Sequence, residues 1–123
     1  MIVLVDTSVW IRFLADRAPH AADLDALLSR DEVSGHDFVY GELLIGDKGG
    51  RRQLLADYAQ MHRAPVVSHV DVVAFVRERR LHGRGVGWID AHLLASALVG
   101  RLKLWTTDPR LWIVAEELGI AYE

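Results

Sequence analysis

The sequence predicts an α/β domain with a mostly parallel central sheet. Residues 2–5 are a short continuous apolar run, which is typical of a strand covered on both faces, and residues 102–106 predict a second buried strand. Segments with helical spacing of apolar residues separate these strands, and strands that alternate with helices favour a parallel sheet. At 123 residues the chain can bury one core but not two, so we predict a single domain over residues 1–123.

The first half of the chain predicts one strand followed by several helices. After the strand at 2–5, Thr7 or Ser8 can cap a helix that continues through Leu14. An apolar stripe at helical spacing predicts the next helix over 20–29. Further along we expect a short strand or turn at 32–35, a helix at 37–45, a glycine-rich break at 46–50 and a helix at 51–61.

The second half predicts three more helices around the second buried strand. Ser68 can cap a helix that runs to about Leu81, and a glycine-rich loop follows it. Pro109 suits the first position of a helix, and Gly119 suits its end. The elements expected here are helices at 68–81, 89–99 and 109–118, a strand at 102–106 and a last strand at 120–122.

Four acidic residues stand inside apolar stretches. Asp6 directly follows the first strand and Asp108 follows the second, so both emerge at the same edge of a parallel sheet. Asp90 lies in the first turn of a strongly apolar helix, and Glu42 lies in mid-helix among apolar neighbours. Buried carboxylates are costly unless they are paired, hydrogen-bonded or bound to a metal. Four of them predict a shared cation.

The composition of this group favours Mg²⁺ or Mn²⁺. Oxygen ligands without histidine or cysteine are what these ions select, and several waters usually remain bound. Ser8, two residues after Asp6, and Thr106, two before Asp108, can orient the carboxylates. Such a site can orient a water molecule and neutralise charge on a phosphate.

Each acid also has a purely structural interpretation. Asp6 and Asp90 can be helix caps, and Asp108 before Pro109 is an ordinary helix start. Glu42 can form a buried ion pair with an arginine. The hydroxyl groups of Ser8 and Thr106 can serve helix capping and strand propensity alone.

The cations are almost all arginines, although the net charge is −3. Of 14 cations only Lys48 and Lys103 are lysines, which leaves 12 arginines, and arginine binds phosphate with a fork geometry that lysine lacks. An arginine-rich codon usage explains the bias equally well. The candidates for binding phosphate near the acids are Arg12, Arg77, Arg79, Arg80, Arg84 and Arg110. Their alternative is a solvated helix face.

Several classes of site and location are excluded or disfavoured. The chain has no cysteine, so it has no disulfide, thiolate metal site or cysteine nucleophile. The six histidines show no ligand spacing, and His92 should face away from Asp90 on a helix. Most of the tryptophans lie in apolar runs, so we expect them in the core or at a protein interface rather than stacked on bases. We find no signal peptide or membrane span and expect a cytoplasmic protein.

The four acids and their surroundings resemble the PIN domain, and within it the VapC-type toxin ribonucleases of bacterial toxin–antitoxin pairs. The resemblance covers nearly the whole chain and rests on the motifs around Asp6, Glu42, Asp90 and Asp108, which read VDTSVWI, GELLIG, DAHLLASA and LWTTD. It implies a PIN-like three-layer α/β/α sandwich with helices on both sides of the sheet. No further acid closely follows Asp108, as one does in some PIN nucleases, which leaves the number of bound metals open.

The function implied by this resemblance is a metal-dependent endoribonuclease. Asp6, Glu42, Asp90 and Asp108 would hold Mg²⁺ or Mn²⁺, supported by Ser8 and Thr106, and a metal-activated water would attack structured RNA, often tRNA. The resemblance also implies a homodimer and a cognate VapB-type antitoxin whose C-terminal segment covers the acidic cleft. Two alternatives stay open: an inactive PIN-like RNA-binding or scaffold domain, and a metal-dependent phosphatase or DNA nuclease.

Overall fold

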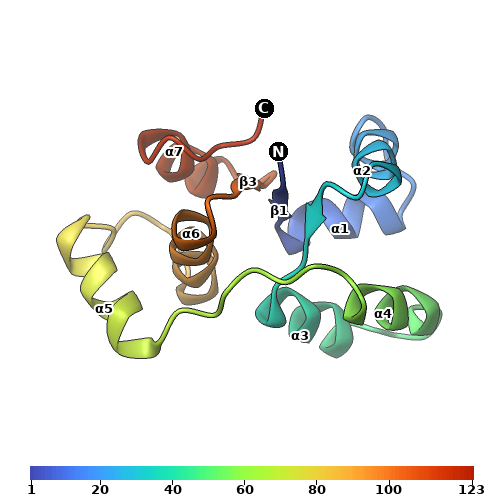
Figure 1. The fold of residues 1–123 in the computed structure, drawn as a ribbon, viewed down its shortest axis with the longest axis horizontal. Coiled ribbons are helices and arrows are strands. Elements are labelled where there is room, and N and C mark those ends of the chain that lie inside the picture. Colours follow the sequence, from blue (N-terminus) through green and yellow to red (C-terminus); the bar gives the residue numbers. More distant parts are fainter.

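The computed structural model describes residues 1–123 and contains seven helices and one three-stranded parallel sheet of order β2-β1-β3. The elements in chain order are β1 (Val3–Val5), α1 (Thr7–Leu14), α2 (His20–Ser29), β2 (Val33–Ser34), α3 (Asp37–Ile45), α4 (Arg52–Ala59), α5 (His69–Glu78), α6 (Trp88–Gly100), β3 (Lys103–Trp105) and α7 (Pro109–Glu117). Helices lie on both sides of the sheet (Figure 1), which confirms the α/β/α fold predicted from the sequence.

The central strand β1 is buried along its whole length, as its continuous apolar sequence predicts. It pairs in parallel with β2 on one side and β3 on the other, and Leu4 lies opposite Ser34 and Leu104. Because all three strands run in the same direction, the residues that follow β1 and β3 emerge at the same edge of the sheet. This edge carries Asp6 and the segment from Thr106 to Asp108.

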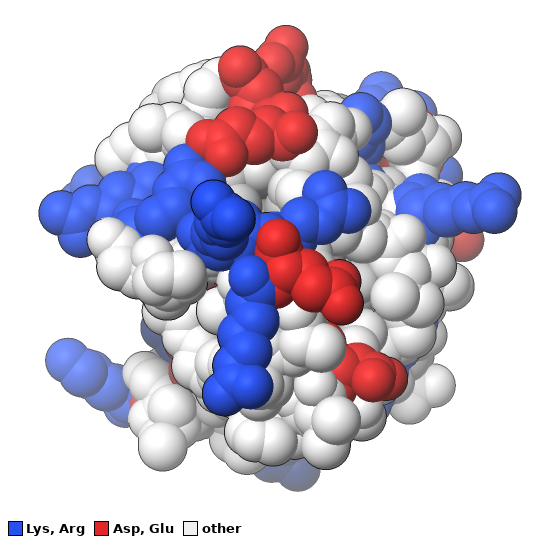
Figure 2. Space-filling view, turned by 90° about the vertical axis from the view of Figure 1, so that its left-hand side faces the viewer, with Lys and Arg blue, Asp and Glu red and all other residues white.

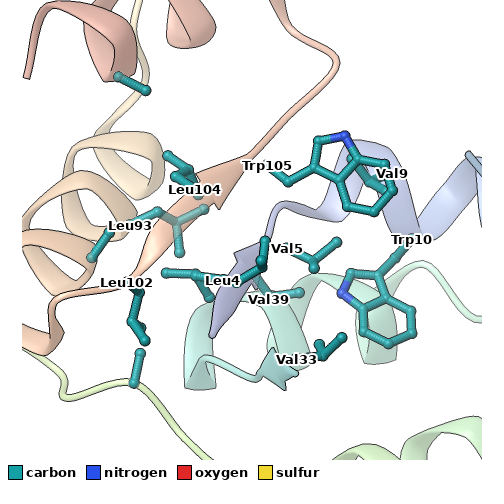
Figure 3. Packing of buried hydrophobic residues seen from close by; sticks show 14 of the residues in the cluster. Leu4, Val5, Val9, Trp10, Val33, Val39, Leu93, Leu102, Leu104 and Trp105 are labelled. Carbon is teal, nitrogen blue, oxygen red and sulfur yellow. The ribbon is translucent and has the colours of Figure 1, made fainter. Parts of the chain in front are cut away.

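The main hydrophobic core is a cluster of 24 buried residues drawn from both ends of the chain, and a second cluster of 3 lies between α5 and α6. Figure 3 shows Leu4 and Val5 of β1 beside Leu104 and Trp105 of β3. The Trp10 ring is 1% exposed and packs edge-on against Tyr58, with ring centroids 5.4 Å apart. The prediction of core packing is therefore confirmed for Trp10 and Trp105, whereas Trp88 lies at the surface with 44% exposure.

Two predicted elements differ from the structure by more than two residues at a boundary. The helix expected to reach Leu81 ends at Glu78, because Arg80 adopts a positive φ of 53° that a right-handed helix cannot contain. The turn brings Leu81 into the core, where it is buried. The strand expected at 120–122 is only an isolated bridge between Ala121 and Leu104, since the chain leaves α7 and meets β3 at that one position. None of the helices combines the length and apolarity that a membrane crossing requires.

Candidate active site

Asp6 occupies the junction between β1 and α1 and is 6% exposed. It stands at the N-cap position of α1, but its side chain makes no capping bond. Its Oδ2 atom instead accepts hydrogen bonds from Ser8 Oγ at 2.8 Å and from Thr106 Oγ1 at 2.8 Å. The expected supporting hydroxyls are thus in contact with Asp6, and Thr7 and Ser8 are not the helix cap.

Thr106 connects Asp6 to Asp108. Its Oγ1 atom donates to Asp6 and accepts the backbone N–H of Asp108 at 3.1 Å. The Asp108 Oδ1 atom caps α7 by accepting the N–H of Arg110 at 2.9 Å. The helix-start interpretation of Asp108 is therefore correct, and the cap leaves Oδ2 without a hydrogen bond from the protein.

Glu42 reaches the same edge from the middle of α3. Its Oε1 atom accepts a hydrogen bond of 2.7 Å from Thr7 Oγ1, which is 35 residues away in sequence. The protein's ion pairs involve other residues, so the predicted alternative of an arginine partner for Glu42 is wrong. The sequence analysis missed Thr7 as a site residue, because nothing local in the sequence signals a partner so distant.

The start of α3 is fixed by a buried histidine. The His36 ring is fully buried, and its Nδ1 atom accepts the N–H of Phe38 at 3.0 Å. An accepting Nδ1 leaves the proton on Nε2, which can donate to Ser96 Oγ at 2.9 Å. Burial lowers the pKa of His36 and so favours this neutral form. These contacts hold the helix that carries Glu42.

Asp90 lies at the third position of α6, where its Oδ2 atom accepts the N–H of the N-cap residue, Gly87, at 3.1 Å. The pKa of Asp90 is raised, first by burial and then by the carboxylates of Asp6, Asp108 and Glu42, while the Gly87 N–H opposes this shift. The three other acids thus act on Asp90 through space. The structure brings all four predicted acids into one electrostatic environment.

The four carboxylates share one pattern of hydrogen bonding. Each binds a protein donor through a single oxygen, which is Oδ2 in Asp6 and Asp90, Oδ1 in Asp108 and Oε1 in Glu42. The other oxygen of each has no hydrogen bond from the protein. A carboxylate held in this way has a fixed orientation and keeps one oxygen for a ligand.

This donor set fits Mg²⁺ or Mn²⁺ in its chemistry. Carboxylate oxygens are the ligands that these ions prefer, and like charges held together favour a cation. With the side chains as they stand, no three histidine or acidic side chains lie close enough to hold one ion directly. At this spacing, at most two of the carboxylates could contact one ion directly. Mg²⁺ tolerates it, because it commonly binds one or two carboxylates and keeps several waters.

The arginine candidates differ in the contacts that their side chains make. Arg12 lies beside the acids, since its Nη1 atom donates to Thr107 Oγ1 at 2.6 Å and to Ser8 O at 3.2 Å. The Arg110 side chain lies over Gly85, where a Cβ atom would come within 2.6 Å of Arg110 Cδ. Arg84 forms a two-point ion pair with Glu117, at 2.8 and 2.5 Å, which offsets its charge.

The remaining arginine candidates form an exposed group at the end of α5. Arg77, Arg79 and Arg80 are all exposed and form no ion pair. Figure 2 shows basic side chains gathered across the middle of the face on which α5 lies. In the chain these three arginines come just before the 81–87 turn. That turn ends at Gly87, whose N–H binds Asp90.

The histidines take no part in the acidic site. His92 is 4% exposed and packs against Phe38 and Trp88, with ring centroids at 4.7 and 5.1 Å. Its pKa is lowered by burial and by His69, and its Nδ1 atom has no hydrogen-bond partner. This agrees with the expectation that His92 faces away from Asp90.

Comparison with known proteins identifies the family. The PIN domain family model matches residues 3–117. This chain belongs to the PIN-domain family. Two curated relatives, both named Ribonuclease VapC32 and both from Mycobacterium tuberculosis (strains CDC 1551 / Oshkosh and ATCC 25618 / H37Rv), are 47% identical over 120 residues. The match covers 97% of this chain and 94% of each relative, so this PIN domain is of the VapC type.

Solved structures share the fold of this PIN domain at low sequence identity. FitAcB from Neisseria gonorrhoeae superposes with a TM-score of 0.62 at 20% identity, over 94% of both chains. PAE2754 from Pyrobaculum aerophilum superposes with a TM-score of 0.59 at 17% identity, over 92% of this chain and 78% of that one. These likenesses confirm the PIN-like fold.

The raised pKa of Asp90 predicts a pH-dependent effect on the stability of this PIN domain. A native pKa above the ordinary 3.8 means that the folded state holds the proton more tightly than the unfolded state. The free energy of unfolding therefore falls as pH rises from below 3.8 through the native pKa of Asp90. In EDTA at pH 7, Asp90→Asn should raise the melting temperature by a few degrees, and it keeps an acceptor for Gly87. The gain should vanish below about pH 3, where Asp90 is protonated in both states. An unchanged or lower melting temperature of Asp90→Asn at pH 7 would contradict the inferred repulsion of Asp90 by the other three carboxylates. The control is Asp25→Asn, which removes an exposed carboxylate from α2.

Proposed function

We propose that this chain is a metal-dependent endoribonuclease that acts as the toxin of a toxin–antitoxin pair. The observation that carries the proposal is the hydrogen-bonded carboxyl edge of the sheet, where Thr106 joins Asp6 to Asp108, Thr7 binds Glu42, and these three carboxylates raise the pKa of Asp90. The chain's 47% identity to a protein named Ribonuclease VapC32 supports RNA as the substrate. All four acids required by the resemblance are present, which disfavours an inactive scaffold.

The protein's own groups have distinct roles in this proposal. Asp6, Asp90 and Asp108 would be the main metal ligands, and Glu42 a ligand or a base that orients the attacking water. A bound Mg²⁺ or Mn²⁺ would offset the charge of the scissile phosphate and acidify water for in-line attack. Ser8 and Thr106 hold Asp6 in one orientation, which limits its rearrangement when substrate binds. The buried junction of β1 and β3 keeps these groups rigid.

The arginines would hold the RNA backbone. RNA and the acidic site are both negative, so phosphate contacts must come from cations at the rim. Arg77 and Arg80 are exposed and form no ion pair, and Arg110 lies two residues after Asp108 and donates its N–H to that side chain. Arg12 is already bound to Thr107 and Ser8, and Arg84 to Glu117, so these two would contribute less to phosphate binding.

An apolar hollow beside Glu42 suits an antitoxin segment. It has a volume of about 330 Å³ and is lined by Asp37, Phe38, Gly41, Glu42, Ile45 and Ile89. Ile45 is 88% exposed, and Leu44 beside it is 52% exposed. A peptide that fills this hollow would bury Ile45 and reach Glu42, so a cation on the peptide could neutralise the acids. We propose a VapB-type antitoxin as this partner.

Other parts of the proposal come from the family resemblance. They are a structured RNA target, with tRNA as the first candidate, a homodimer, and action in the cytoplasm, where translation would be inhibited. The whole of residues 1–123 would act as a single PIN domain.

Loss of a proposed ligand should abolish cleavage without unfolding the protein. Asp6→Asn should lower the rate of RNA cleavage by more than about 100-fold, because even groups that only support a metal ligand commonly contribute 10- to 100-fold. The rate is measured on a structured transcript with Mg²⁺ or Mn²⁺, and EDTA should abolish wild-type cleavage. Asp25→Asn removes the same charge from the surface and is the matched control. Undiminished cutting in EDTA, or faster turnover of single-stranded DNA or a phosphate monoester, would refute the proposal.

Removing the exposed arginines should weaken RNA binding in a salt-dependent manner. In the inactive Asp6→Asn background, the pair Arg77→Gln and Arg80→Gln should lower affinity and flatten the plot of log affinity against log salt by roughly one unit for each phosphate that is no longer neutralised. Arg110→Gln should act similarly, and Arg84→Gln less, because Glu117 already binds it. The pair Arg52→Gln and Arg101→Gln, which are also exposed and form no ion pair, is the charge-matched control. Equal losses of affinity in the two double variants would rule out specific phosphate binding by Arg77 and Arg80.

A charge in the apolar hollow should disrupt antitoxin binding. Ile45→Glu should weaken the complex with the cognate VapB-type antitoxin by at least about tenfold, since burial of an isoleucine side chain contributes roughly 1.5–3 kcal/mol. Val70→Glu places the same charge on another exposed apolar residue, on α5, and should leave affinity near the wild-type value. Calorimetry gives both constants. Equal losses in the two variants would contradict the assignment of the hollow.

A further inference from the structure

We infer that Thr7 is a positioning residue for the proposed reaction, which fixes the Glu42 carboxylate toward the acidic site. This inference rests on the proposed function and adds a group outside the four acids and their two expected hydroxyls. The juxtaposition that carries it is the 2.7 Å hydrogen bond from Thr7 Oγ1 to Glu42 Oε1.

Thr7 is well placed to hold a distant side chain. It is the first residue of α1 and directly follows Asp6, so its Cα position is set by the buried junction between β1 and α1. The backbone of the preceding residue, Asp6, is held to β3 because its N–H donates to Trp105 O at 2.8 Å. Helices α1 and α3 are packed together, and the Thr7 hydroxyl spans the boundary between them. Thr7 thus links Glu42 to the same rigid edge that carries Asp6.

Glu42 needs such a restraint more than the three aspartates do. A glutamate has one more rotatable bond than an aspartate, so more rotamer freedom must be lost to fix its carboxylate. The aspartates are held by donors close by in sequence or on the adjoining strand end. Glu42 has only Thr7. Without that hydroxyl its carboxylate would be free to turn toward solvent.

The chemistry of the contact suits a carboxylate that acts through its second oxygen. The Thr7 hydroxyl donates to Oε1, because an ionised carboxylate can only accept. This directs Oε2, which has no protein partner, away from Thr7 and makes it available to a cation or a water molecule. Groups that orient a ligand in this way typically change metal affinity or activity by roughly 10- to 100-fold when they are removed.

The test compares Thr7→Val, which keeps the shape but loses the hydroxyl, with Thr7→Ser, which keeps the hydroxyl. Two quantities are measured: the Mn²⁺ dissociation constant without RNA, and kcat and KM for RNA cleavage. Thr7→Val should weaken Mn²⁺ binding or lower kcat by roughly tenfold or more, with KM little changed, and Thr7→Ser should stay close to the wild type. Ser29→Ala removes a surface hydroxyl from α2 and should match the wild type.

A double-mutant cycle shows whether Thr7 acts through Glu42. In the Glu42→Ala background, Thr7→Val should cause no further loss, because the group that it positions is gone. Thermal unfolding of each variant verifies folding. A Thr7→Val protein within about twofold of the wild type in both quantities, an equal loss in the Glu42→Ala background, or no rescue by serine would overturn the inference while the nuclease assignment stands. A wild type that takes up no Mn²⁺ and cuts no RNA would overturn both.

Discussion

The hydrogen bond from Thr106 to Asp6 is the interaction on which the rest of the site depends. It joins the segments that leave β1 and β3, which are 100 residues apart in sequence and adjacent in the sheet. Thr106 also fixes the backbone of Asp108, and Ser8 holds the N–H of Thr107 at 3.1 Å. Arg12 then binds Thr107. Two strand ends are thereby tied into one rigid edge, and the acids on them cannot separate to relieve their repulsion.

Repulsion among the four carboxylates destabilises the folded state, and hydrogen bonds to each carboxylate offset it. Burial and three neighbouring carboxylates raise the pKa of Asp90, so the acids do oppose one another. Each of them binds a donor of its own, and hydrogen bonds to charged groups contribute roughly 1.5–3 kcal/mol each. None forms an ion pair with an arginine or a lysine. Negative charge therefore remains uncompensated at the edge, which is the property that a divalent cation or a cationic peptide would satisfy.

The sequence predicted those features that are encoded locally. The apolar run before Asp6 and the predicted strand before Asp108 located these two acids, and helical spacing located α2 and α3 at the observed bounds. The end of α5 was missed because the positive φ of Arg80 depends on how Leu81 packs in the core. The Thr7–Glu42 and Arg84–Glu117 contacts were missed because each joins segments distant in the chain, and only the folded arrangement decides which side chains meet.

Helix capping and ligand binding entered the sequence analysis as competing interpretations of the same acids, and the structure shows that they are compatible. Asp90 and Asp108 each cap a helix through one carboxylate oxygen and leave the other without a protein partner. The cap selects one rotamer, so the helix start provides the orientation that would otherwise require an additional residue. Asp6 and Glu42 lack a capping bond and receive hydroxyl groups from Ser8, Thr106 and Thr7. A capping motif at the carboxyl edge of a parallel sheet is therefore no argument against a ligand role. It is one means by which a small domain with 34 buried residues can hold four carboxylates in place.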